Sequence, residues 1–195
     1  TGTDVYRDIQ HDAQAQASLR LATRLIVLQD MALRELTPAL RTKADVVYQS
    51  ARPLARKPPL QRSFEVLVIG HLREEKDPLR AALSLHHLPG AIRVTHVGKD
   101  LDAALAHQAT ALMRAEPRYR WLGAREHAEV RRYLARAKLL VISSRMEGGA
   151  NVVSEAIAAG CPVVASYISG NIGMLGKDYA GYFKLGDEHD LARVL

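Results

Sequence analysis

The chain has 195 residues and a formal net charge of +6, and 48% of its residues are hydrophobic but only 5% aromatic. No apolar run approaches the roughly 20 residues of a membrane span, and nothing near Thr1 resembles a signal peptide, so we expect a cytoplasmic protein without a membrane partner. The basic residues are scattered and lack interleaved aromatic residues, which argues against nucleic-acid binding and leaves anionic small molecules as the better partners.

The first 50 residues alternate between helical and strand patterns. The predicted elements are a helix over 8–21, a strand over 24–28, a helix over 29–36 and a strand over 44–49. Thr1 to Asp4 read as the loop after a strand, so we expect residues 1–50 to be the C-terminal part of an N-terminal, acceptor-side domain. Residues 51–63, which include Pro53, Pro58 and Pro59, are predicted to be a linker.

From residue 64 onward, apolar strands and amphipathic helices alternate regularly. The predicted strands are 64–69, 92–97, 119–122, 138–142 and 162–165, and the predicted helices are 78–87, 102–115, 126–137 and 151–159. This order predicts an α/β fold with a doubly wound, parallel, Rossmann-like domain over 64–195. Such sheets bind ligands at the carboxyl ends of their strands, and Gly70, Gly98, Gly123 and Glu147 all follow predicted strands.

Two glutamates, Glu147 and Glu155, bracket a glycine turn between the strand at 138–142 and the helix that begins near Asn151. The first turn of a helix has backbone N–H groups without intrahelical partners, and the helix dipole favours an anion there. Gly148 and Gly149 would let a pyrophosphate approach this backbone closely. The alternative is that both glutamates are ordinary solvent-exposed residues.

This Glu-x(7)-Glu pattern, together with the Gly-Cys-Pro-Val-Val segment that follows it, resembles the C-terminal domain of retaining, two-domain GT-B glycosyltransferases. The resemblance implies that Glu147 faces the transferred sugar and that Glu155 holds the ribose hydroxyls of the nucleotide. It places Gly148, Gly149, Ala150 and Asn151 in the donor site. It also implies catalysis without a metal ion and without a cofactor, because the UDP-sugar is a substrate.

A second polar loop, at 71–78, follows the strand that ends at Gly70. The same family has an arginine and a lysine here, which neutralise the departing diphosphate where negative charge grows in the transition state. Lys76 matches the lysine, but His71 stands at the arginine position and Arg73 lies two residues later. Either Arg73 supplies the missing guanidinium or the site holds its anion differently, and a mixed-charge surface loop is the further alternative.

Longer blocks of the chain resemble a narrower family, the selenosugar synthases of selenoneine biosynthesis. These blocks are 1–8, 71–78, 116–123, 144–150 and 170–183. The resemblance implies a reaction between a UDP-sugar, UDP-N-acetylglucosamine, and selenophosphate, which gives a 1-seleno sugar and UDP. Ala150 and the segment 171–173 depart from the residues of ordinary relatives, and they fit either an altered acceptor or a loss of activity.

Three further residues are candidates for the acceptor side. Asp4 would contact sugar or acceptor, or it caps its own loop. Arg145 would bind the anionic acceptor, or it forms a salt bridge. Asn171 lies in a glycine-containing segment, 170–173, which would offer backbone N–H groups to a phosphate or form a plain turn.

Several side chains are predicted to be structural. His96, inside a strand, is expected to be packed or hydrogen-bonded, and Trp121 to belong to the core. Cys161 is the only cysteine, which excludes an internal disulfide and a thiolate metal cage, and it reads as a small buried residue.

Two other functions compete with seleno-sugar synthesis. One is a glycosyltransferase that acts on a hydroxyl acceptor, and the other is a catalytically silent UDP-binding module. A dinucleotide-dependent oxidoreductase is disfavoured because Gly70-His71-Leu72-Arg73 lacks the Gly-x-Gly-x-x-Gly pattern.

Overall fold

The computed structural model describes residues 4–58 and 63–195 and divides the chain into two compact units. Unit 1 contains Thr1–Ser50, Met146–Asn151 and Tyr167–Ala180, and unit 2 contains Ala51–Arg145, Val152–Ser166 and Gly181–Leu195. The domain boundaries expected from the sequence stay a prediction, and each unit is described by itself.

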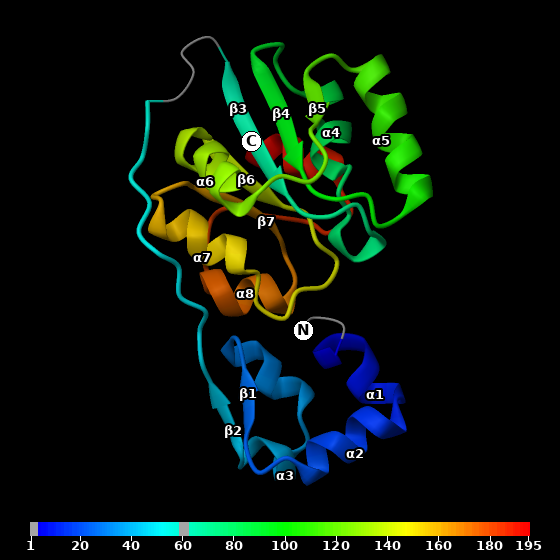
Figure 1. The fold of residues 1–195 in the computed structure, drawn as a ribbon, viewed down its shortest axis with the longest axis vertical. Helices are drawn as coiled ribbons and strands as arrows, with labels where there is room; N and C mark the ends of the chain where they lie inside the picture. Colours follow the sequence, from blue (N-terminus) through cyan, green and yellow to red (C-terminus); the bar gives the residue numbers. More distant parts are fainter. Residues whose placement is uncertain (1–3, 59–62) are drawn as a thin grey trace. The chain divides into compact units, whose positions relative to one another are not determined.

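Unit 2 is built on a six-stranded sheet in which every pairing is parallel (Figure 1). Its strands are β3 (Phe64–Ile69), β4 (Ile92–Val97), β5 (Tyr119–Trp121), β6 (Leu139–Ile142), β7 (Val163–Ser166) and β8 (Tyr182–Phe183). The spatial order is β5-β4-β3-β6-β7-β8, so the winding direction reverses between β3 and β6. The predicted α/β class with a doubly wound parallel sheet is therefore confirmed, and the reversal is the place where such folds bind ligands.

Helices cover both faces of this sheet. They are η3 (Glu74–Lys76), α4 (Arg80–Ser84), η4 (Leu85–His87), α5 (Ala103–Ala115), α6 (His127–Arg136), α7 (Asn151–Ala158) and α9 (Glu188–Val194). In Figure 1, α4 and α5 lie on one side of the sheet and α6 on the other. Strands β6 and β7 are buried at every position, which explains their uninterrupted apolar sequence.

The core of unit 2 forms where the sheet meets its helices. Val66, Val94 and Val141 from three strands pack there with Leu85 and Leu191, and each of the five is at most 1% exposed. Full burial of such a side chain stabilises the fold by about 1.5–3 kcal/mol. This packing fixes the carboxyl ends of the strands, on which the loops discussed below are mounted.

Unit 1 contains the predicted elements of residues 1–50, but they are shorter and more broken than the sequence suggests. They are η1 (Asp4–Asp8), α1 (Ile9–His11), α2 (Ala13–Leu21), β1 (Leu25–Val27), η2 (Asp30–Glu35), α3 (Pro38–Arg41) and β2 (Ala44–Val46). The helix predicted over 8–21 is interrupted at Asp12, whose backbone is extended and whose carboxylate accepts hydrogen bonds from the N–H groups of Gln14 and Ala15. Asp12 therefore caps a new helix instead of continuing the first one.

The described part of the predicted linker, residues 51–58, forms neither helix nor strand and lies against α6. The N–H of Lys57 donates to the carbonyl of Ala135 at 2.9 Å, and Arg131 donates to the carbonyls of Arg52 and Pro53. Because these bonds hold the backbone directly, this segment is attached to unit 2.

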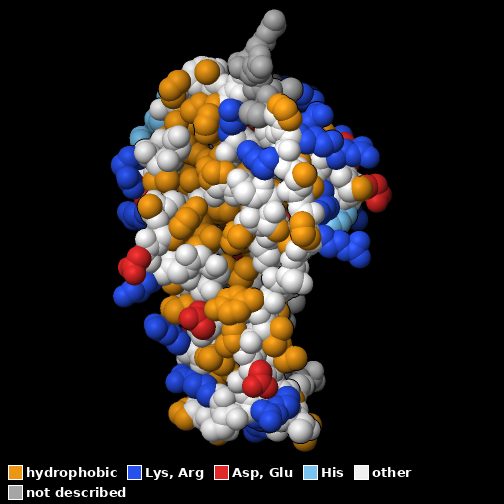
Figure 2. Space-filling model, turned by 90° about the vertical axis from the view of Figure 1, so that its left-hand side faces the viewer, with side chains coloured by type: hydrophobic (Ala, Val, Ile, Leu, Met, Phe, Trp, Pro, Cys, Tyr) orange, Lys and Arg blue, Asp and Glu red, His pale blue; other side chains and the backbone are white. Residues whose placement is uncertain are grey.

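The basic side chains are dispersed over the surface, as their scatter along the sequence predicts. On the face drawn in Figure 2, most Lys and Arg side chains lie along the margins, a few lie nearer the middle, and hydrophobic side chains gather between the margins. Among the described residues, no helix combines the length and the apolar composition that crossing a membrane requires.

Candidate active site

The loops after β3 and β4 approach each other so closely that one of them requires glycine. A Cβ built on Gly98 would lie 1.8 Å from the carbonyl oxygen of Gly70. That carbonyl lies 2.8 Å from Nε2 of His96, and Nδ1 of His96 lies 3.0 Å from the hydroxyl of Tyr119. Since a carbonyl only accepts, Nε2 carries the proton and Nδ1 accepts from Tyr119.

His96 is therefore a buried, neutral side chain that supports Gly70, as its place inside a strand suggests. It is fully buried, and burial lowers its pKa to about 4. Burial also raises the pKa of Tyr119, which keeps the phenol protonated as a donor. This pair positions the loop after β3 and is not exposed to a substrate.

A pocket of about 350 Å³ opens beside Gly70 at the carboxyl ends of β3 and β4. We call it the basic pocket, since five of its lining residues have basic side chains and none is acidic. These five are His71, Arg73, Lys76, Lys99 and Arg125, and the rest of the lining is Ile69, Gly70, Val97, Gly98, Ala124 and Val130. Such a lining concentrates positive potential and favours an anionic ligand.

His71 enters this pocket as a hydrogen-bonding group without a charge. Its Nδ1 accepts a 3.0 Å hydrogen bond from the backbone N–H of Lys99, so the proton of the neutral ring is on Nε2. Burial and then the positive charges of Arg73, Lys76 and Lys99 lower the pKa of His71. At neutral pH the ring therefore offers a donor, and the formal charge comes from its lysine and arginine neighbours.

The side chain of Lys76 lies against Gly70 and lines the same pocket. A Cβ on Gly70 would lie 3.8 Å from Cγ and Cδ of Lys76, which is ordinary van der Waals contact. Gly70, His71, Arg73 and Lys76, all singled out in the sequence, thus meet in one pocket. Lys99 and Arg125 were missed because they follow other strands and belong to no recognisable spacing.

The loop after β6 lies against the loop after β3, as expected from the pairing of these two strands. Oγ of Ser143 donates to the carbonyl of Asp77 at 2.8 Å, and the N–H of Arg145 donates to the carbonyl of Glu75 at 2.8 Å. The polar loop at 71–78 and the start of the segment that leads to Glu147 are therefore in contact within unit 2. The side chain of Arg145 is exposed and forms no ion pair with any described residue, so it does not form the salt bridge that was its alternative.

Glu155 is not the exposed helix residue that its position on α7 would allow. Its side chain is 8% exposed, and Oε1 lies 2.6 Å from Nε2 of His127, the first residue of α6. The His127 side chain is 70% exposed. This contact joins residues of two helices that are 28 positions apart in the sequence, so no local pattern could have indicated it, and it fixes the carboxylate of Glu155 as an acceptor.

Glu147 to Asn151 belong to unit 1, and Glu147 is 7% exposed, which contradicts the alternative of a solvated loop carboxylate. Ala150 is buried and Asn151 is exposed at the first residue of α7. Gly149 packs against Leu28, whose Cβ would lie 2.5 Å from a Cβ at that glycine. Gly148 is buried, and Gly149 allows this segment of the loop to pack closely against Leu28.

The segment 170–173 is helical, so the alternative of a plain turn is wrong. It lies in α8 (Ser169–Leu175), where the N–H of Ile172 donates to the carbonyl of Ile168, and the binding of a phosphate by other N–H groups of this segment stays a prediction. The glycines are needed for packing inside unit 1. A Cβ on Gly170 would lie 1.8 Å from the carbonyl oxygen of Glu147, and one on Gly173 would lie 1.9 Å from Oε1 of Gln29.

Asn171 is fully buried in α8, and the side chain of Asp4 lies outside the described part of the structure. The candidate residues are thus divided between the units, with Glu147 in unit 1 and Lys76 and Glu155 in unit 2. Their convergence around one donor stays a prediction. Within residues 4–58 and 63–195 no group of three or more His, Cys, Asp or Glu side chains is arranged to hold a metal ion.

Comparison with known proteins identifies the family. The model of the glycosyl transferases group 1 family matches residues 53–194, and the chain therefore belongs to that family. No curated protein sequence matches the chain significantly.

Solved structures have the same fold. HepE of Anabaena in complex with UDP and glucose is 20% identical with a TM-score of 0.77, over 92% of this chain and 54% of HepE. Sucrose-phosphate synthase of Thermosynechococcus elongatus is 19% identical with a TM-score of 0.80, over 99% of this chain and 55% of the synthase. A mutant of TarM of S. aureus, solved with fondaparinux, alpha-GlcNAc-glycerol and UDP, is 18% identical with a TM-score of 0.73, over 92% of this chain and 38% of TarM. The chain thus spans about half the length of the first two proteins.

Proposed function

We propose that the chain is the nucleotide-sugar-binding part of a glycosyltransferase that transfers the sugar of UDP-N-acetylglucosamine to selenophosphate. The observation that carries this proposal is the basic pocket, which is lined by five basic side chains and no acidic one. It lies at the carboxyl ends of β3 and β4, beside the point where the sheet reverses its winding. A nucleoside diphosphate has the charge that such a pocket accommodates, and HepE was solved with UDP and with UDP-glucose.

In the proposed reaction the bond between the anomeric carbon and the diphosphate breaks, and a carbon–selenium bond forms on the same face. Water then cleaves the selenium–phosphorus bond, so phosphate and the 1-seleno sugar are released together with UDP. The charges of Lys76 and Arg73, and the Nε2–H of His71, stabilise the diphosphate as it leaves. Lys99 adds a third positive charge from the loop after β4. These groups act where negative charge grows, so they lower the barrier and do more than hold the substrate.

The nucleoside and the sugar are assigned to the two glutamates. Glu155, fixed by His127, accepts hydrogen bonds from the ribose hydroxyls, and Glu147 faces the transferred sugar. Selenophosphate is itself a strong nucleophile, so the proposed reaction needs no strong protein base. Arg145 is an exposed cation without an ion-pair partner among the described residues and supports an anionic acceptor.

The test is mass spectrometry of the full-length protein with UDP-N-acetylglucosamine, with and without selenophosphate. The proposal predicts a hexosamine with the isotope pattern of selenium, together with UDP, only when both substrates are present. Sugar transfer to simple alcohols at a higher rate would favour a hydroxyl acceptor instead. Tight UDP binding with no transfer to any acceptor would favour a silent binding module.

A further inference from the structure

The loop after β3 contains one backbone conformation that needs support. Asp77, the residue after Lys76, has φ of 42° and ψ of 53°. In the part of the chain that the structure describes, it is the one non-glycine residue at positive φ. A Cβ makes this left-handed region less favourable, and although aspartate tolerates it better than most residues, contacts with the surroundings are needed to hold the residue there firmly.

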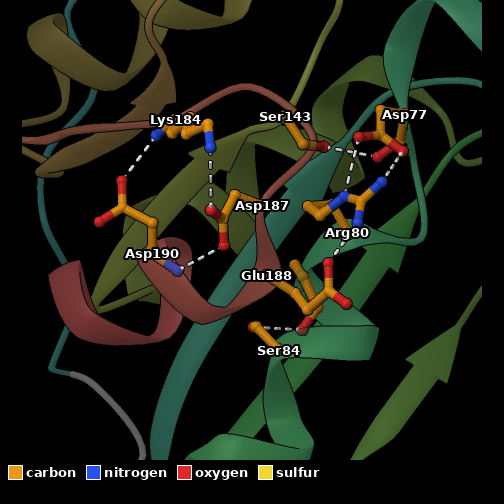
Figure 3. Close-up of polar contacts among 9 residues, drawn as sticks. Asp77, Arg80, Ser84, Ser143, Lys184, Asp187, Glu188 and Asp190 are labelled. Carbon is orange, nitrogen blue, oxygen red and sulfur yellow. Dashed lines mark hydrogen bonds and ion pairs between the residues drawn. The ribbon is translucent and has the colours of Figure 1, made fainter.

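Both the side chain and the main chain of Asp77 are fixed (Figure 3). Its carboxylate accepts hydrogen bonds from Nε and Nη2 of Arg80, at 2.9 and 3.3 Å, and the Asp77 and Arg80 side chains are only 11% and 14% exposed. Its carbonyl oxygen accepts from Oγ of Ser143. A planar guanidinium that meets a carboxylate with two nitrogens fixes orientation as well as distance.

The same guanidinium also reaches the C-terminal helix. Nη1 of Arg80 donates to Oε2 of Glu188 in the first turn of α9, as Figure 3 shows. The pKa of Glu188 is lowered by a hydrogen bond from its own backbone N–H and by Arg80, so this carboxyl is ionised at neutral pH. Arg80 is thus the cation between two carboxylates, and its loss would leave both without that counter-charge.

Lys76 is the residue whose direction depends on this arrangement. Its N–H donates to the carbonyl of Arg73 at 3.0 Å, and its own carbonyl accepts from Oγ of Ser143 at 3.2 Å. Its side chain lies along Gly70 and lines the basic pocket. If Asp77 left the left-handed region, the backbone at Lys76 would turn and carry the ammonium group with it.

We propose that Arg80 is a positioning residue for Lys76. It acts through Asp77 to direct the ammonium group of Lys76 into the basic pocket, and Glu188 makes the first turn of α9 part of the same support. Arg80 does not line the pocket itself. The inference rests on the proposed function, because it takes the basic pocket as the site of the donor diphosphate.

The test is a double-mutant cycle on UDP affinity, measured by isothermal titration calorimetry with the full-length protein. Arg80→Met and Lys76→Ala are each expected to weaken UDP binding about tenfold, the loss of one well-placed charged contact. Because Arg80 acts through Lys76, the double variant should bind UDP no more weakly than Lys76→Ala alone. Two effects that multiply in the double variant would overturn the inference.

Arg118→Met is the matched control, because Arg118 also forms a shielded pair, with Glu116, but beside the amino end of β5. The UDP affinity of Arg118→Met should equal that of the unaltered protein.

If Arg80→Met does not fold, Glu188→Gln replaces it in the cycle. Glu188→Gln is expected to weaken UDP binding about threefold, and it should have no further effect when Lys76 is already replaced by alanine. Unaltered UDP affinity in the variant used would contradict the inference. A parent protein that does not bind UDP would overturn the proposed function together with it, whereas independent effects in a UDP-binding protein overturn this inference alone.

Discussion

Oε1 of Glu155 lies 2.6 Å from Nε2 of His127, and this single contact joins α7 to the first turn of α6. The carboxylate is buried while most of the imidazole is exposed, and the Nε2–H of His127 is already used by Glu155, so the pair presents the carboxylate as a fixed acceptor. Ribose hydroxyls donate hydrogen bonds, which matches a fixed carboxylate acceptor. His127 therefore becomes part of the proposed nucleoside site, although nothing in its sequence surroundings marks it.

His127→Ala should weaken UDP binding about three- to tenfold, because Glu155 loses the partner that fixes its buried carboxylate. His127→Gln retains a donor and should recover part of the loss. His107→Ala, which removes an exposed histidine of α5, is the control and should leave the UDP affinity unchanged. Calorimetric titration measures the UDP affinity of all three variants. If His127→Ala binds UDP as tightly as His107→Ala does, His127 is not part of the nucleoside site.

The sheet of unit 2 was predictable because its strands are short apolar runs bounded by glycines and polar loops. The bounds of β3 and β4 agree with the predicted 64–69 and 92–97. The helical pattern after Asn151 likewise predicted the start of α7. These elements are determined by local periodicity and burial, which the sequence displays directly.

The parts that were not predictable depend on contacts between distant segments. The helix α8 contains Gly170 and Gly173, residues that favour turns, and it is stable because both glycines face a neighbouring segment at very close range. The same reasoning applies to Lys99 and His127, whose places depend on strand order and on helix packing. In α8, tertiary packing overrides local propensity, whereas Lys99 and His127 show contacts that no local pattern displays.

Lys76→Ala should reduce UDP release from UDP-N-acetylglucosamine by about two to three orders of magnitude, since it removes a charge from the departing diphosphate. Lys76→Arg should recover part of the rate, because it restores the charge with a different shape. The far-UV circular dichroism and the thermal midpoint should match the unaltered protein. Near-normal turnover in a folded Lys76→Ala variant would contradict the role assigned to this residue.

His96 should make the stability of the fold depend on pH between about 6.5 and 4. Its pKa is lowered from 6.5 to about 4 in the folded state, so the unfolded chain binds the additional proton and stability falls as the pH decreases through this window. The full contribution, present above pH 6.5, is about 3 kcal/mol. Urea unfolding at pH 7.5, 6 and 5 measures it, and the decrease should be smaller in His96→Gln. An equal decrease in that variant would assign the effect to other groups.

Gly98→Ala should damage both the fold and the basic pocket, because its Cβ would lie 1.8 Å from the carbonyl oxygen of Gly70, a backbone atom that cannot rotate away. We expect a loss of about 3 kcal/mol in the free energy of unfolding, at the upper end for an overpacked site. Gly90→Ala is the matched control, since no atom lies within 4 Å of a Cβ there. Urea unfolding and UDP titration of the two variants check this. The displaced carbonyl of Gly70 is the one that accepts a hydrogen bond from His96, so Gly98→Ala should also weaken UDP binding. A Gly98→Ala variant with normal stability and normal UDP affinity would show that the close approach of these two loops is not required.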